Sequence, residues 1–261
     1  MQKVILVTGA TDGIGFETAK VLVEQGHHVL VHGRSPSKLK GVEEKLSALG
    51  KVSSYVADLS NLAEVDTLTD TLKRDFSNID VVINNAGVYA TNQPATQDGF
   101  DVRFVVNTLA PYKLAKALLP IIPTSGRVVN LSSAAQASVN IDALNGKKTL
   151  GDGEAYAQSK LALTMWSRHL GLENREQGPI IVSVNPKSFL GSKMVKEAYG
   201  VAGNDLSLGA DILVRASLSD EFNQAAGLYF DNDVEAFADP HPDALNQAKV
   251  NQVVEAIDAL I

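Results

Sequence analysis

The sequence feature that most constrains the fold is a short apolar run, followed at once by a glycine-rich turn and a helical pattern. Residues 4–7 read V-I-L-V, a continuous run of the kind that is buried on both faces of a parallel sheet. The turn T-G-A-T-D-G-I-G follows directly, and Phe16, Ala19 and Val23 then recur at helical spacing. This pattern predicts a strand, a tight turn and a helix at the start of the chain.

The glycine-rich turn also predicts a phosphate-binding site. Glycines let the backbone approach a ligand, and the free amides and dipole of a helix N-terminus favour an anion. The spacing is G-x-x-x-G-x-G, which differs from the standard dinucleotide fingerprint, and an ordinary strand-to-helix turn is the alternative. The candidate cofactor-binding residues in this turn are Gly9, Thr11, Asp12, Gly13, Ile14 and Gly15.

A second predicted strand, 28–32, ends beside Arg34, where dinucleotide folds place the residue that meets the adenosine ribose. An acid there accepts from the ribose 2′-hydroxyl, whereas an arginine offers a bidentate fork to a 2′-phosphate. Ser35 and Pro36 are typical of an N-cap and a first helical residue, and Lys38 adds a second charge. Arg34 therefore predicts NADP(H) rather than NAD(H), with a solvated loop arginine as the alternative.

Strands and helices continue to alternate along the chain. Strands are predicted at 52–56, 79–83, 127–131, 180–184 and 228–230, and helical spacing marks segments at 39–49, 62–72, about 210–218 and 250–261. In such folds the carboxyl ends of the strands face the ligand, so Asp58 either accepts from the adenine amine or begins a turn. Further candidate cofactor-binding residues at these ends are Leu59, Asn85, Ala86, Gly87, Pro186, Lys187 and Phe189.

Two other polar positions stand out. Asn107 lies in the apolar stretch F-V-V-N-T-L-A-P of a predicted long helix, where an amide needs partners, so it is either functional or a buried structural asparagine. Ser133 follows the strand 127–131. The segments 88–100, 140–153 and 189–208 match no motif, and we expect them to line a substrate pocket.

A phenol and an ammonium lie one helical turn apart in the stretch A-Y-A-Q-S-K. At four residues' spacing, Tyr156 and Lys160 share one helix face, with Cβ atoms about 6 Å apart. A cation so placed lowers the pKa of a phenol. Leu163 and Trp166 continue the helical spacing, and Glu154 lies at the positive end of the helix dipole. The alternative is an ordinary Tyr–Lys pair on a surface helix.

Composition excludes several functions. A net charge of −7 argues against nucleic-acid binding, and the absence of cysteine excludes disulfides, thiol catalysis and Cys-ligated zinc. The five histidines show no metal-ligand spacing, so no metal site is expected. No apolar run is long enough to span a membrane, and the N-terminal run is shorter than a signal-peptide core. We therefore expect one cytoplasmic domain, residues 1–261.

Five motifs stand in order along the chain: T-G-A-T-D-G-I-G, N-N-A-G, the in-helix Asn107, V-V-N-L-S-S and Y-A-Q-S-K. Together they resemble the compact branch of the short-chain dehydrogenase/reductase family. The resemblance implies a doubly wound, Rossmann-type α/β fold in three layers. Its seven-stranded parallel sheet would have the strand order 3-2-1-4-5-6-7, with NADP(H) across the carboxyl edge.

The same resemblance implies a catalytic role for four residues. Tyr156 would be the general acid/base, and Lys160 would favour its phenolate and hold the nicotinamide ribose. Ser133 would hydrogen-bond the substrate carbonyl, while Asn107 would position a water linking Lys160 to solvent. The implied reaction is hydride transfer between NADPH and a small-molecule carbonyl or alcohol.

One position departs from the family pattern. Lys187 stands where the family usually has glycine, in a turn that meets the carboxamide end of the cofactor. A bulky residue there shifts the nicotinamide or requires a strained turn. The alternative function is therefore an NADP(H)-binding sensor or scaffold with weak or no turnover. A sugar-nucleotide epimerase or dehydratase is disfavoured by the length and the glycine spacing.

The segment between Ser133 and Tyr156 is long and resembles that of the retinol-dehydrogenase-like branch, which indicates a bulky hydrophobic substrate. Family members often pair through the helices that bear Asn107 and Tyr156. The resemblance thus implies a homodimer or homotetramer, unless the long segment covers that face.

Overall fold

The fold is that of a computed structural model, which describes residues 1–200 and 202–261. Part of the predicted pocket segment 189–208, namely Val201 and the side chains of residues 197–199, lies outside the described residues.

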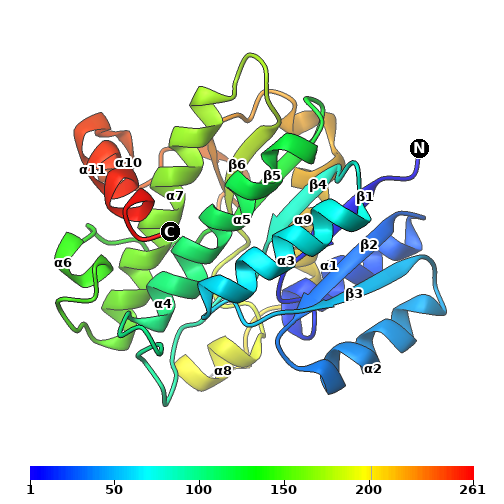
Figure 1. Cartoon of the computed structure of the whole chain (residues 1–261), viewed down its shortest axis with the longest axis horizontal. Coiled ribbons are helices and arrows are strands. Elements are labelled where there is room, and N and C mark those ends of the chain that lie inside the picture. The colour runs from blue at the N-terminus through cyan, green and yellow to red at the C-terminus, as the bar shows by residue number, and fades with distance from the viewer. Residues whose placement is uncertain (201) are drawn as a thin grey trace.

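In the described part of the chain, eight strands form one sheet, of which β1 to β6 are labelled in Figure 1. The order is β3 (Val52–Val56), β2 (His28–Gly33), β1 (Val4–Val7), β4 (Val81–Asn84), β5 (Arg127–Leu131), β6 (Ile180–Asn185), β7 (Tyr229–Asp231) and β8 (Ala236–Ala238). The pairs from β3 through to β7 are parallel, whereas β8 runs antiparallel to β7. The predicted order of seven parallel strands is confirmed.

The eighth strand was not predicted. Its sequence A-F-A is too short to show an alternating pattern, and it extends the sheet only because the chain turns back after β7. The predicted seven-stranded sheet is therefore corrected to eight strands.

Helices cover both faces of the sheet (Figure 1). They are α1 (Gly13–Glu24), α2 (Pro36–Ser47), α3 (Leu62–Asp75), α4 (Val102–Phe104), α5 (Ala110–Leu118), α6 (Ile141–Leu144), α7 (Asp152–Glu173), α8 (Lys193–Tyr199), α9 (Leu206–Leu218), α10 (Pro242–Leu245) and α11 (Gln247–Asp258). The short helices α6, α8 and α10 were not predicted, because one or two turns show no helical period.

Alternation along the strands divides the apolar core in two. In β1, Ile5 and Val7 belong to the cluster that includes apolar residues of α1, α2 and α9. Leu6, between them, belongs to the cluster that includes apolar residues of α3, α5, α7 and α11. Since successive side chains of a strand point to opposite faces, the central strands β1, β2, β4, β5 and β6 supply both cores. The result is three layers, a sheet between two layers of helices. The helix layers cover the faces of the sheet but not the carboxyl ends of its strands.

The predicted long helix around Asn107 is interrupted by a π-helical turn, η1 (Val105–Leu109), between α4 and α5. Pro111 has no backbone N–H, so it cannot donate to the carbonyl of Asn107 as a regular α-helix requires. Turns of this kind often mark functional positions. None of the described helices combines the length and the apolar character that a membrane crossing needs.

Candidate active site

A cleft of about 780 Å³ follows the carboxyl ends of strands β1 to β6. Its walls come from turns that are far apart in the sequence but share one edge of the sheet. With the exception of Asn107, every individual candidate residue predicted from the sequence lines this cleft, whereas the predicted pocket segment 140–153 supplies none of its lining. The fold thus brings these residues together around one cleft.

At one end of the cleft, the turn after β1 has the shape that its glycines were predicted to allow. Gly9 and Gly13 have φ angles of +66° and +57°, a backbone region that residues other than glycine rarely adopt. A Cβ on Gly15 would lie 2.3 Å from Asn85 Nδ2, so the turn also packs closely on the end of β4. Asp12 caps α1 by accepting from the amide of Gly13 at 2.7 Å. The first turn of α1 then leaves amide donors beside the cleft.

His32 holds this turn by a hydrogen bond. The sequence indicated only that the histidines are not metal ligands and did not predict this contact. Its Nδ1 accepts from the amide of Gly9 at 3.3 Å, so its Nε2 carries the proton and donates to Ala57 O at 3.0 Å. Burial lowers the pKa of His32 to about 4, against the opposing effect of the bond to Ala57. The imidazole is therefore neutral and ties the turn to the end of β3.

Cationic side chains gather near the same end. Arg34 and Lys38 are exposed and line the cleft, and Ser35 caps α2 by accepting from the amide of Lys38 at 3.5 Å. The predicted N-cap at Ser35 is thus confirmed. Asp58 lines the cleft and also begins a turn, accepting from the amide and hydroxyl of Ser60 at 2.9 and 2.8 Å.

At the other end, α7 presents Tyr156 and Lys160. The Lys160 ammonium donates to Leu131 O at 2.7 Å and lies 5.7 Å from the centroid of the Tyr156 ring. Only 3% of Lys160 is exposed, and this burial lowers its pKa to about 8. Tyr89 also packs here, with its ring centroid 4.9 Å from that of Tyr156. Tyr89 lies in the predicted pocket segment 88–100, but no motif singled it out.

The two serines after β5 differ in what they contact. Ser132 is buried and shares a hydrogen bond of 2.6 Å with Thr164. Ser133 is half-buried in the cleft wall, and its Oγ accepts from the amide of Ala135 at 3.1 Å. Of the pair, Ser133 is thus the one whose side chain is not enclosed by the core.

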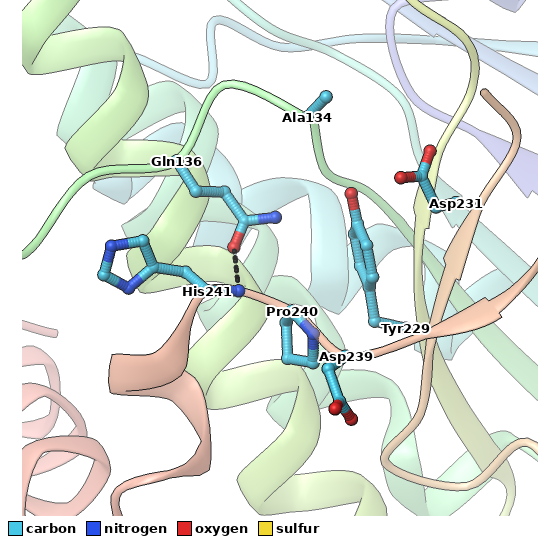
Figure 2. A pocket seen from close by; sticks show the side chains of 7 residues that line it. All are labelled: Ala134, Gln136, Tyr229, Asp231, Asp239, Pro240 and His241. Carbon is cyan, nitrogen blue, oxygen red and sulfur yellow. Dashed lines mark hydrogen bonds between the residues drawn. The ribbon is translucent and has the colours of Figure 1, made fainter. Parts of the chain in front are cut away.

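Two side chains hold the backbone carbonyl of Ser133. Its carbonyl accepts from Gln136 Nε2 at 2.9 Å and from the hydroxyl of Tyr229 at 3.3 Å. Gln136 and Tyr229 line a second hollow of about 220 Å³, next to Ala134, and Gln136 also accepts from the amide of His241 (Figure 2). The sequence offered no signal for these contacts, because Tyr229 follows Ser133 by almost a hundred residues.

Asn107 is fully buried and does not line the cleft. Its Nδ2 donates to Val88 O and to Ser159 Oγ, both at 2.9 Å, and its Oδ1 accepts from the amide of Val88 at 2.8 Å. These bonds tie the chain after β4 to α7, as the structural alternative requires. A Cβ on Gly87 would lie 3.5 Å from Asn107 Oδ1 and 3.6 Å from Lys160 Nζ, so both groups border the same glycine.

The turn after β6 is strained. Lys187 has φ of +122° and Phe189 has φ of +53°, although neither residue is glycine. Of the two outcomes predicted for a bulky residue at position 187, the structure thus has the strained turn. Among the described residues, no group of His, Asp and Glu is placed to hold a metal ion.

Comparison with known proteins gives the class to which this fold and site belong. The family model described as short chain dehydrogenase matches residues 3–200. Because this is more than half of the chain, the protein belongs to the short-chain dehydrogenase family of oxidoreductases.

Several named relatives share this similarity. Polyprenol dehydrogenase of Homo sapiens is 38% identical over 179 residues, which cover 64% of this chain and 54% of that protein. Retinol dehydrogenase 12 of Mus musculus is 30% identical over 244 residues, which cover 87% of this chain and 77% of that protein. The chain thus spans about half the length of the human relative.

A solved structure is also similar along most of the chain. The crystal structure of the angucycline C-6 ketoreductase LanV with bound NADP has a TM-score of 0.70 and 26% sequence identity. The alignment covers 88% of this chain and 93% of that one.

Proposed function

We propose that the protein is an NADPH-dependent oxidoreductase that interconverts a carbonyl compound and the corresponding alcohol. The observation that carries the proposal is one continuous cleft with cations at one end and the Tyr156–Lys160 pair at the other. Charge at the first end suits a phosphorylated ribose, and a phenol beside a buried ammonium suits proton transfer.

The cleft fits NADP(H) in its chemistry. Arg34 and Lys38 would hold the 2′-phosphate, and the first turn of α1 would hold the diphosphate with its amides. The similar structures of LanV and of a Shigella flexneri short chain dehydrogenase each contain NADP, which supports the choice of cofactor.

NADPH, when bound, supplies the hydride. Tyr156 donates its hydroxyl proton to the carbonyl oxygen of the substrate, and Ser133 Oγ donates a hydrogen bond to the same oxygen. Lys160 keeps a positive charge beside the phenol at pH values below about 8, which favours the phenolate that remains. In the same proposal, Asn107 orders a water near Lys160 at Gly87.

The substrate is proposed to be a bulky apolar carbonyl or alcohol. Val102, Val106, Phe189 and Met194 supply apolar surface to the cleft. Relatives named for polyprenol and retinol support the same class of molecule.

The proposal is tested with purified protein and a panel of aldehydes and ketones, with NADPH and NADH compared as hydride donors. We expect turnover with NADPH and its loss in the Tyr156→Phe variant, which keeps the ring but removes the hydroxyl. Ser133→Ala should lower turnover. Ser132→Ala is its matched control, since the buried Ser132 hydroxyl shares a hydrogen bond with Thr164. Equal turnover by the Tyr156→Phe variant would contradict the assigned mechanism.

A second candidate function is an NADP(H)-binding sensor or scaffold, which the strained Lys187 favours. Titration with NADPH, followed by thermal unfolding, separates the two functions. A rise in the melting temperature together with no turnover on the whole panel would support the sensor.

A further inference from the structure

The turn after β6 is strained, and residues from other parts of the chain hold its backbone by hydrogen bonds. We call residues 185–189 the exit turn. Its two positive φ angles, at Lys187 and Phe189, belong to residues that do not favour them. Such conformations persist only where the surrounding structure fixes them.

Support comes from residues 231–235, the last residue of β7 and the loop that joins it to β8, which we call the hairpin loop. The amide of Asn232 donates to Asn185 O at 3.1 Å, and Asn232 Nδ2 donates to Pro186 O at 2.9 Å. On the far side of Lys187, Asp233 accepts from the amide of Ser188 at 2.9 Å and from its hydroxyl at 2.5 Å. The hairpin loop therefore holds the backbone immediately before and immediately after Lys187.

A second layer of bonds fixes the hairpin loop itself. Asn185 Nδ2 donates to Asp231 Oδ1 at 2.8 Å and to Asp233 Oδ2 at 2.9 Å, and the amide of Asp233 donates to Asp231 Oδ1 at 3.0 Å. Burial raises the pKa of Asp233, but the hydrogen bonds from Ser188 and Asn185 outweigh it and leave the pKa below its usual value. Asp233 is therefore ionised at neutral pH and accepts all three of its side-chain bonds.

Other contacts across this interface are weaker. The Lys187 ammonium lies 4.0 Å from Glu235 Oε1, and the Glu235 side chain is 71% exposed, so this ion pair contributes little. The exposed Val234 forms the tip of the same loop. Within the hairpin loop, the support thus comes from Asn232 and Asp233 rather than from the ion pair of Lys187. Asn204 also holds the exit turn, since its Nδ2 donates to Ser188 O at 3.1 Å and its amide donates to Phe189 O at 2.6 Å.

We propose that Asn232 and Asp233 are positioning residues, which hold the exit turn in a glycine-like conformation and so set the wall of the cleft beside Tyr156 and Lys160. The exit turn lines the cleft through Pro186, Lys187 and Phe189, and it follows β6, which pairs with the strand whose Leu131 carbonyl accepts from Lys160. This inference rests on the proposed binding of NADP(H), whose nicotinamide would lie against the same wall.

The test combines Asp233→Ala with Lys187→Gly. Glycine adopts the required φ unaided, so the support matters less once position 187 is glycine. We expect Asp233→Ala to weaken NADPH binding about tenfold in the native background, and to change it by no more than about twofold in the Lys187→Gly background. Binding is measured from the fluorescence of the bound nicotinamide, whose emission maximum in Asp233→Ala should move toward that of free NADPH.

Two further variants keep the test decisive. Val234→Ala changes the same loop without touching the exit turn and should bind NADPH like the native protein. Asn232→Ala removes the bond to Pro186 and should repeat the Asp233→Ala result if that variant does not fold.

The outcomes separate this inference from the proposed function. Equal losses in both backgrounds would mean a merely structural role and overturn the inference, as would unchanged binding and emission in folded Asp233→Ala. If the native protein shows no binding of NADPH, the proposed function fails and the inference fails with it.

Discussion

The two ends of the cleft meet the same backbone requirement in different ways. At the end lined by Arg34, the positive φ angles fall on Gly9 and Gly13. At the end lined by Tyr156, they fall on Lys187 and Phe189. The first end is shaped by the choice of residue, whereas the second is shaped by hydrogen bonds from the hairpin loop. A site can therefore keep a glycine-like turn without glycine, but only with support from elsewhere in the fold.

The largest expected effect is at the glycine end. In Gly15→Ala, the new Cβ would lie 2.4 Å from Gly9 O, a backbone atom that cannot easily move. We expect a loss of about 3 kcal/mol or more in the free energy of unfolding, measured by urea denaturation.

Gly41→Ala is the matched control for this variant. It adds the same methyl group within α2, where nothing lies within 4 Å, and should stabilise the protein by about 0.5–1 kcal/mol. An equal response of the two variants would show that crowding does not shape this turn.

Acid should weaken the glycine end specifically, through His32. In the unfolded chain this imidazole binds a proton near pH 6.5, but in the folded protein only near pH 4. Proton binding therefore favours the unfolded state below pH 6.5. Above that pH, His32 causes no loss in the free energy of unfolding. The loss grows as the pH falls and levels off near pH 4, at about 3 kcal/mol.

The free energy of unfolding of native protein and of His32→Gln, measured from pH 7 to pH 4, checks this. The difference between the two curves should shrink or reverse as the pH falls, because glutamine takes up no proton. Parallel curves would rule out His32 as the titrating group.

Arg34 should decide the choice of cofactor. Arg34 lines the cleft, and we propose that its guanidinium binds the 2′-phosphate, so Arg34→Ala should weaken NADPH binding about thirtyfold and leave NADH binding unchanged. Lys40→Ala, in the exposed pair with Glu44, is the control for a lost surface charge. Equal weakening of both cofactors would remove the assigned role from Arg34.

The smallest expected effect is that of replacing Lys187 in the exit turn. Lys187→Gly removes the strain at φ +122° and should stabilise the protein by about 1 kcal/mol, a rise of about 2–4 °C in the melting temperature. Lys193→Gly, at the first position of α8, should instead destabilise it. A lower melting temperature for Lys187→Gly would show that the turn is not strained.

The same contrast explains what the sequence could predict. Strands such as Val4–Val7 and Arg127–Leu131 were predicted with the observed bounds, because continuous apolar runs are visible locally. The turn of Gly9 and Gly13 was predicted for a similar reason, since glycine in the sequence directly indicates a backbone that needs a positive φ or close packing. At this end of the cleft, local sequence carries most of the information.

The rest depends on contacts between distant residues. Asp233 holds Ser188 from 45 positions away, and the hydroxyl of Tyr229 reaches the Ser133 carbonyl across 96. The antiparallel β8 and the π-helical turn at Asn107 likewise follow from packing and from Pro111, not from a periodic pattern. The contact between Tyr89 and Tyr156 could not be seen for the same reason.

The most direct measurement is a crystal structure of the protein with NADP⁺. We expect the 2′-phosphate within hydrogen-bonding distance of Arg34, and the nicotinamide between the exit turn and Tyr156. A cofactor bound in the opposite direction, or a nicotinamide that the exit turn holds away from Tyr156, would contradict it.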